Sequence, residues 1–157
     1  MIYIGIALMI LVADLGIKYY IEHQRNEAQE DLILKNSVIV RKHHNKGIAL
    51  NTLDKHPNVV KGLSLGMTIL ILVASLFSCF NLSKKNMEDS IGRKLGLTMV
   101  LGGALSNTYD RVFRGYVVDY FSFNVKWKKL SSVIFNIADL FIFIGSLMMS
   151  LFESKRK

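Results

Sequence analysis

Residues Val133 to Phe152 have the sequence VIFNIADLFIFIGSLMMSLF, an apolar run in which Asp139 is the only charged residue. A run of this length, about 20 residues, is what a helix needs to cross the hydrocarbon core of a bilayer. A carboxylate inside such a helix costs about 2.5–3.5 kcal/mol on insertion scales, and intramembrane acids commonly mark functional sites. We therefore expect a chemical role for Asp139.

Three further apolar segments of similar length precede this one, Ile2–Ile21, Gly62–Leu82 and Leu95–Phe113. With 51% hydrophobic residues and a mean hydropathy of +0.32, the chain is more apolar than an ordinary soluble domain. The sequence predicts an all-α, multi-pass integral membrane protein, a bundle of four transmembrane helices forming one domain over residues 1–157. The N-terminus has no basic segment before its apolar run, so we interpret that run as a retained helix rather than a cleaved signal.

The charge distribution favours a membrane protein over a nucleic-acid-binding one. The net charge is +8, but no run of basic residues alternates with aromatics, and no zinc-finger or helix-turn-helix pattern is present. Basic residues are dense in Ser83–Lys94 and in the tail, Ser154–Lys157. The positive-inside rule therefore predicts that both termini are cytoplasmic. Three lysines, Lys126, Lys128 and Lys129, run against this assignment because they would lie outside.

The first connection, Glu22–Lys61, is expected to carry a small extracytoplasmic, β-rich surface element. Leu32–Val40 is rich in Ile, Leu and Val and predicts a strand. Asn45-Lys46-Gly47 predicts a turn, after which Gly47–Leu50 is the candidate start of another strand. Before them, Asn26–Asp31 is a candidate short interfacial helix.

The polar residues of the predicted spans gather at one end of the bundle. In an up-and-down arrangement the first and third connections share one face. Six residues lie toward that face: Asp14 in the first span, Asn107, Asp110 and Arg111 in the third, and Asn136 and Asp139 in the fourth. Polar groups gathered in this way face the interior of a membrane bundle and mark a site.

Two groups of these residues have both a structural and a functional interpretation. Asp14 and Lys18 are spaced i,i+4, which favours an ion pair with Lys18 snorkelling outward. That pair either fixes the first helix or orients the site. Asn107 shares a helical face with Asp110 or Arg111, and Arg111 is expected to bind a carboxylate or a backbone carbonyl. This cluster either closes the helix or surrounds a catalytic pair.

A second acid, Asp119, follows the extended segment Tyr116–Val118 and would lie over the mouth of the bundle if that segment is a strand. Asn136 and Asp139 are spaced i,i+3, so both are expected on one helical face. Two carboxylates in a poorly hydrated pocket share one proton and can activate water for attack on a peptide carbonyl. The alternative is two unrelated surface acids.

Small residues predict where helices approach closely. Gly62-x-x-x-Gly66 and Gly102-Gly103-Ala104 are the candidate packing positions.

No metal or organic cofactor is predicted. The single cysteine, Cys79, excludes an internal disulfide and a cysteine-based metal site. No HExxH motif is present, and the histidines all lie in the first connection: His23, His43, His44 and His56.

Five motifs, in family order and at family-like spacing, resemble those of bacterial lipoprotein signal peptidase, the signal peptidase II family, and the resemblance spans Asp14 to Gly145. They are Asp14-x-x-x-Lys18, Asn45-x-Gly47-x-Ala49, Gly102-Gly103-Ala104-Leu105-Ser106-Asn107-Thr108-Tyr109-Asp110-Arg111, Gly115-x-Val117-Val118-Asp119 and Phe135-Asn136-Ile137-Ala138-Asp139. The run from Gly102 to Asp119 is highly specific.

The resemblance implies a four-helix aspartyl protease of the bacterial cytoplasmic membrane. Such an enzyme removes the signal peptide from diacylglyceryl-modified prolipoproteins, cutting just before the lipidated cysteine. Its partners would be lipidated prolipoproteins and membrane lipid, it would need no cofactor, and globomycin-like compounds would inhibit it. The resemblance assigns a catalytic pair, Asp119 and Asp139; substrate-site residues, Asn45, Asn107, Arg111 and Asn136; and supporting positions, Asp14, Lys18, Asp110 and Gly47.

The chain departs from the family pattern at four places. Leu15 stands where Gln is usual, Leu50 replaces an aromatic, Ser106 replaces a Gly, and Ser131–Ile134 lacks a common proline. None of these removes a catalytic group, so they bear on substrate preference and inhibitor affinity.

Two other functions fit parts of the sequence. The altered motif positions are compatible with a non-catalytic paralogue that binds lipoproteins, although both aspartates are retained. Intramembrane acids also occur in small ion-coupled transporters. A transport path needs polar groups through the whole membrane, and one end of this bundle has none within its spans.

Overall fold

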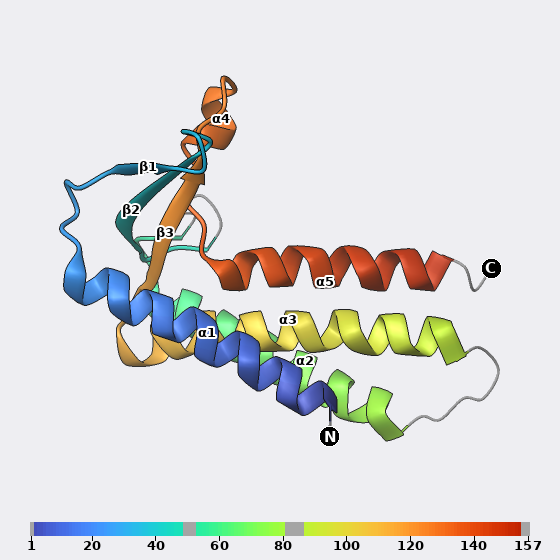
Figure 1. Cartoon of the computed structure of the whole chain (residues 1–157). Helices are drawn as coiled ribbons and strands as arrows, with labels where there is room; N and C mark the ends of the chain where they lie inside the picture. Colours follow the sequence, from blue (N-terminus) through green and yellow to red (C-terminus); the bar gives the residue numbers. More distant parts are fainter. Residues whose placement is uncertain (1, 49–52, 81–86, 155–157) are drawn as a thin grey trace.

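The computed structural model describes residues 2–48, 53–80 and 87–154. Within these ranges, four long helices run side by side and a small sheet covers one end of them (Figure 1). The helices are α1 (Ile2–Gln24), α2 (Pro57–Phe80), α3 (Met87–Phe113) and α5 (Ile137–Ser154). α3 is the central helix because it packs against each of the other three, most extensively against α5.

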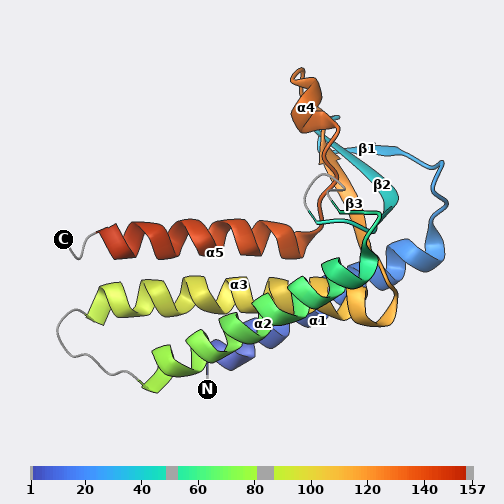
Figure 2. The same ribbon diagram turned by 180° about the vertical axis from the view of Figure 1, so that it is seen from behind.

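The sheet is antiparallel, with the strand order β1 (Asp31–Ile33), β2 (Val38–Asn45) and β3 (Val117–Phe123). α3 leads into β3 through Gly115, whose φ of +82° is a left-handed conformation that glycine adopts without steric cost. A one-turn helix, α4 (Lys128–Ser131), follows β3 and stands to the side of the bundle (Figures 1 and 2).

The surface element differs from its prediction in detail. Leu32–Val40 is not one strand, because the backbone turns at Leu34, Lys35 and Asn36, all with positive φ, and β2 folds back onto β1. Asn26–Asp31 contains a turn instead of a helix, and β1 begins at its last residue. Gly47 and Ile48 are not in a strand, and Ala49 and Leu50 lie outside the described residues.

The start of the fourth helix is also later than expected. Phe135 forms an isolated antiparallel bridge with Phe121 of β3, so this part of the predicted span is extended chain. α5 begins only at Ile137. Asp139 therefore lies in the first turn of α5, about one turn closer to the start of the helix than a span beginning at Val133 would place it.

The mostly helical fold with apolar helices is confirmed. α1 and the segment Pro57–Ser78 of α2 are long and apolar enough to cross a membrane. The apolar part of α5, Ile137–Phe152, is shorter. α3 carries charged residues at both ends, which lowers its mean hydropathy.

Glycines bring α3 against α1 and α5. A Cβ on Gly102 would lie 2.9 Å from the carbonyl oxygen of Ala7, and one on Gly103 would lie 2.5 Å from that of Ala138. Both contacts confirm the prediction for this motif.

The other predicted glycine pair is wrong. Neither Gly62 nor Gly66 has an atom within 4 Å of an added Cβ. Instead Gly96 of α3 faces Gly145 of α5, where a Cβ on Gly96 would lie 2.7 Å from the Gly145 carbonyl oxygen. Gly96 ends a Gly92-x-x-x-Gly96 motif that the sequence analysis did not single out, whereas Gly145 belongs to no such motif.

Candidate active site

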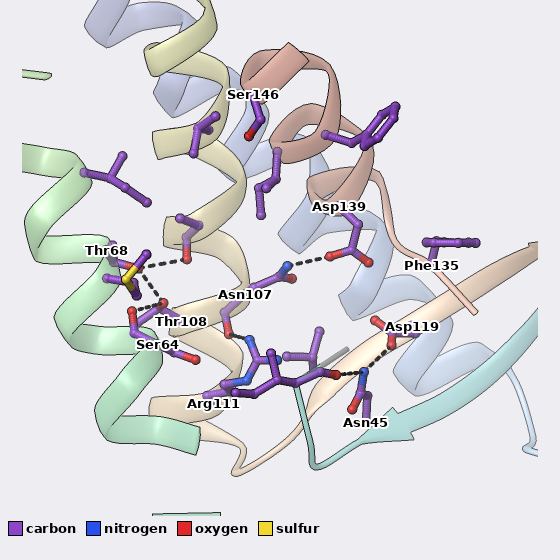
Figure 3. Close-up of a pocket in the computed structure, with 18 of the residues that line it drawn as sticks. Asn45, Ser64, Thr68, Asn107, Thr108, Arg111, Asp119, Phe135, Asp139 and Ser146 are labelled. Atoms are coloured by element: carbon purple, nitrogen blue, oxygen red, sulfur yellow. Dashed lines mark hydrogen bonds between the residues drawn. The ribbon is translucent and has the colours of Figure 1, made fainter. Parts of the chain in front are cut away.

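Asp119 and Asp139 line one cavity of about 570 Å³ (Figure 3). Asp119 is the third residue of β3, where its neighbours Val118 and Tyr120 are buried and anchor the strand. Asp139 comes from the first turn of α5. The rest of the lining comes from α2, α3, α5 and the segments around the sheet, so the cavity exists only where these elements meet.

Asn136 joins the two carboxylates. Its side-chain Nδ2 donates to Asp119 Oδ1 at 2.7 Å, and its backbone N–H donates to Asp139 Oδ2 at 3.1 Å. In return, Asn136 Oδ1 accepts the backbone N–H of Asp139 at 2.9 Å. This reciprocal pair is a capping box at the start of α5. Asn136 thus precedes the helix, which corrects the expectation that it shares a helical face with Asp139.

Asn45 holds the other oxygen of Asp119. It ends β2, opposite Val117 of β3, and its Nδ2 donates to Asp119 Oδ2 at 3.0 Å. Its own Oδ1 accepts the backbone N–H of Gly47 at 3.0 Å, which tightens the following turn. Both oxygens of Asp119 therefore accept an amide hydrogen bond.

Lys18 reaches the site from α1. Its Nζ donates to Asn107 Oδ1 at 2.8 Å, and Asn107 Nδ2 donates to Asp139 Oδ1 at 2.8 Å. Lys18 is fully buried and lies 2.8 Å from Asp14 and 3.2 Å from Asp110. The predicted pair with Asp14 is confirmed, but the outward snorkelling is wrong, because two carboxylates compensate the buried ammonium.

Arg111 binds backbone carbonyls, one of its two predicted alternatives. Its guanidinium donates to Gly47 O at 2.9 Å and to Asn107 O at 3.5 Å. This brings the loop after β2 against α3 at the mouth of the cavity. Asp110 is directed away from the cavity toward Lys18, the backbone N–H of Val118 at 3.2 Å and Arg114 at 3.0 Å. It therefore supports the start of β3.

Burial raises the pKa of Asp119 to about 7, and the charge of Asp139 adds to the effect. The hydrogen bonds from Asn45 and Asn136 act in the opposite direction because they stabilise the carboxylate. Near neutral pH, Asp119 is thus poised between its two protonation states, as an acid–base group requires.

No group of three or more His, Cys, Asp or Glu side chains within the described ranges could hold a metal ion. His44 instead pairs with Glu22 at 2.9 Å and with Glu27 at 3.3 Å.

Comparisons with known proteins match this arrangement over nearly the whole chain. The family model for signal peptidase II (Peptidase_A8) matches residues 6–154. The chain belongs to the signal peptidase II family.

Curated relatives support the assignment. The chain is 34% identical to the lipoprotein signal peptidase of Brucella ovis over 90% of this chain and 82% of that protein. It is 31% identical to that of Haemophilus ducreyi over 99% and 93%, respectively. A solved structure described as a bacterial membrane enzyme, determined by the in meso method at 2.3 Å, superposes with a TM-score of 0.80 at 25% identity, covering 98% of this chain and 87% of the other.

As a signal peptidase II family member, the protein is a bacterial membrane protein and a protease that removes signal peptides from prolipoproteins. One departure from the family pattern has a structural role. The Ser106 hydroxyl is fully buried, donates to Asp14 Oδ2 at 2.6 Å and accepts from Lys18 Nζ at 3.2 Å. A glycine there could make neither bond.

Tyr120 and Thr68 are among the residues in and around this signal peptidase II site that sequence reasoning missed. The Tyr120 hydroxyl donates to Asp14 Oδ1 at 2.9 Å and accepts the backbone N–H of Ile137 at 2.9 Å, tying α1 to the start of α5. Thr68 of α2 hydrogen-bonds Thr108 of α3 at 2.7 Å. A hydroxyl in an apolar helix is a weak signal. Tyr120 could have been found as the residue next to Asp119 in the predicted strand.

Proposed function

We propose that this protein is an aspartyl endopeptidase whose catalytic pair is Asp119 and Asp139. Its substrate is a diacylglyceryl-modified prolipoprotein, which it cuts before the lipidated cysteine. The observation that carries the proposal is that two carboxylates from separate elements line one cavity and are both held by Asn136. Unrelated surface acids would not share a hydrogen-bonded residue.

The mechanism needs one proton on the pair. The ionised carboxylate takes a proton from water as the water oxygen attacks the peptide carbonyl carbon. The protonated partner then gives its proton to the leaving amine as the C–N bond breaks. A pKa of about 7 for Asp119 supports a shared proton at neutral pH. The two groups titrate as a unit, so neither is assigned as the base.

The amides around the pair are proposed to serve substrate binding and orientation. Asn45 and Asn136 hold Asp119, Asn107 holds Asp139, and Arg111 holds the loop at Gly47. Asp14, Lys18, Asp110 and Gly47 support them from outside the cavity.

The membrane arrangement we propose has four spans, α1, α2, α3 and α5, in a single domain. α5 is about 27 Å long at 1.5 Å per residue, close to the hydrocarbon thickness. Large apolar side chains are exposed along three of these helices, as expected of surfaces that face lipid: Ile4, Leu8 and Met9 on α1, Leu70, Val73 and Phe77 on α2, and Phe143, Leu147 and Leu151 on α5. α3 is shielded by the others, which explains why it needs less apolar surface.

The cavity supports lateral entry of a lipidated substrate. Much of its lining is apolar and comes from α2 and α5, which lie on either side of α3. These apolar residues include Met67, Ile71, Ile142 and Phe143. In the proposed orientation the sheet is extracytoplasmic and both termini are cytoplasmic. Acyl chains would then lie along the apolar part while the cleavage site meets the aspartates. Globomycin-like inhibitors would compete for the same cavity.

The test uses purified Asp119→Asn and Asp139→Asn proteins with a lipidated prolipoprotein. Each substitution should lower the cleavage rate by about 10²–10⁴-fold or more, because an acid–base group is lost. Asp54→Asn, at an exposed turn before α2, is the matched control and should cleave at the normal rate. Circular dichroism and thermal unfolding check that all three proteins fold. Full processing by either active-site variant would refute the catalytic pair.

A further inference from the structure

The sheet carries a lateral extension that the catalytic site does not use. It consists of the turn Leu34–Ser37 and the segment Asn124–Ser132, which includes α4. Two hydrogen bonds join these parts: the backbone N–H of Asn124 donates to Ser37 O at 2.9 Å, and its side-chain Nδ2 donates to Asn36 O at 2.7 Å. We call this unit the lateral tip.

The lateral tip is strongly basic. It holds four exposed lysines, Lys35, Lys126, Lys128 and Lys129, and its sequence contains no aspartate or glutamate. Within the described part of the chain, none of the four is in an ion pair, whereas the basic residues Arg25, Arg41 and Lys42 nearer the bundle each pair with a carboxylate. The tip therefore presents uncompensated positive charge.

Exposed apolar side chains accompany these lysines. Trp127, which precedes the first residue of α4, is 67% exposed, and Leu34 is 71% exposed. Tryptophan flanked by lysine is the combination found where proteins meet the headgroup layer, because the ring is amphipathic and the ammonium groups bind phosphate.

The position of the tip matches that layer. In Figures 1 and 2 the long helices run across the page, and α4 stands beside the bundle at the level of the first turn of α5. A membrane plane perpendicular to the helices and passing through the start of α5 would therefore also meet α4. The tip extends along this plane and not away from it.

We propose that the lateral tip binds anionic phospholipid headgroups of the leaflet on which the sheet lies. Trp127 sits at the headgroup level and the four lysines bind the lipid phosphates. The proposal rests on the membrane arrangement of the proposed function, but not on its chemistry. It also accounts for the lysines that contradict the positive-inside rule, since they act in binding and not in orientation.

Trp127 is the only tryptophan in the chain, so its fluorescence reports on the tip alone. The full-length protein is reconstituted in phosphatidylcholine vesicles with or without 30 mol% phosphatidylglycerol. Quenching by lipids brominated high on the acyl chain and by aqueous acrylamide is then measured. With phosphatidylglycerol we expect a blue-shifted emission, stronger quenching by bromolipid and weaker quenching by acrylamide. In 1 M salt, where the Debye length is about 3 Å, the difference should disappear.

A charge-matched pair of variants isolates the lysines. Replacing Lys126, Lys128 and Lys129 together by Gln should abolish the phosphatidylglycerol dependence, whereas replacing all three by Arg should retain it. Cleavage of a lipidated prolipoprotein is measured in parallel, so failure of the catalytic proposal is seen separately.

Three results would overturn the proposal. In the first, acrylamide quenches Trp127 fluorescence freely and bromolipid does not quench it, in vesicles with and without phosphatidylglycerol. In the second, bromolipid quenching is equal with and without phosphatidylglycerol. Slower cleavage in the Gln variant without any lipid-dependent fluorescence would also overturn it, and would assign the lysines to the substrate.

Discussion

Lys18 determines which way the amide of Asn107 lies. An ammonium group only donates, so the amide oxygen of Asn107 must face Lys18 and its NH₂ group must face Asp139. Asp14 and Asp110 compensate the charge of Lys18. The buried ionic cluster thus fixes a hydrogen-bond donor next to Asp139, and removing one partner would leave an uncompensated buried charge.

Asn45 should tune the pH dependence of cleavage. Its hydrogen bond stabilises ionised Asp119 and lowers that group's pKa, which burial raises to about 7. Asn45→Ala removes the bond, so the pKa should rise further. If activity requires one proton on the pair, it is lost as pH rises through this pKa. The alkaline limb of the kcat/KM profile should therefore move to higher pH.

The control for this shift is Asn58→Ala, at an exposed position in the first turn of α2. Its alkaline limb should coincide with that of the unmodified protein. A limb that moves to lower pH in Asn45→Ala would contradict the inferred role of the hydrogen bond.

At the scale of elements, the start of α5 serves both folding and the site. Asn136 caps the helix through its Oδ1 and donates to Asp119 through its Nδ2. The turn that begins the helix therefore also sets the position of both carboxylates.

These two roles of Asn136 should separate by substitution. Asn136→Ser keeps a capping oxygen but loses the donor, so stability should hold while kcat falls about tenfold to a hundredfold. Asn136→Ala should lose the same activity and, in addition, about 1 kcal/mol of stability. Thermal unfolding and steady-state cleavage measure the two effects. Equal activity of the Ser variant and the unmodified protein would show that the Asn136 side-chain donor has no role in cleavage.

The packing of α3 on α5 depends on glycine at the contact. A Cβ at Gly145 would meet the Gly96 carbonyl, so Gly145→Ala should destabilise the protein by about 1–3 kcal/mol. Gly66→Ala, also within a helix but with open space at its Cβ, should be neutral or stabilise by up to about 1 kcal/mol. Thermal unfolding of both variants in one detergent compares them. Equal melting temperatures for Gly145→Ala and Gly66→Ala would show that α3 and α5 can move apart at Gly145 with little loss of stability.

At the scale of the whole molecule, the packing of α2 and α5 on the central helix α3 forms the cavity. α2 and α5 both pack on α3, and residues of all three line the cavity that reaches Asp119 and Asp139. The polar and apolar parts of the cavity lie in one continuous space (Figure 3). This arrangement suits a substrate whose peptide and lipid parts lie side by side.

Filling the apolar part should weaken substrate binding without affecting the chemistry. Ser146 of α5 lines the cavity, so Ser146→Trp should raise KM for a lipidated substrate about tenfold, equivalent to about 1.4 kcal/mol, with kcat nearly unchanged. Ser150→Trp, one turn further along α5 and exposed, is the matched control and should leave KM unaltered. An unchanged KM in Ser146→Trp would exclude this part of the cavity from binding.

Much of this site was predictable because its residues follow local rules. Apolar runs near 20 residues long identify helices, and the i,i+4 spacing of Asp14 and Lys18 does predict their ion pair. Arg111 was expected to bind a carboxylate or a carbonyl, and it binds carbonyls. The motif residues also predicted the signal peptidase II family, and the match to the family model confirmed it.

The remainder depended on distant contacts. Whether Lys18 reaches water or stays buried depends on Asp110, far along the chain, and local spacing contains no information about that residue. Phe135 is extended because it pairs with Phe121 of β3. As a result, α5 starts later than the apolar run does, and Asn136 becomes its N-terminal cap. Gly96 and Gly145 matter only because α3 and α5 pack there.

By itself, then, the sequence determined the apolar helices, the gathering of polar residues at one end and the family, because hydrophobic length and motif spacing are properties of a chain. Only the tertiary structure decided that Asn136 links Asp119 to Asp139, that Lys18 orients Asn107, and that the basic tip extends beside the bundle. These are contacts between segments up to about a hundred residues apart, and their geometry is set by how helices and strands pack against one another.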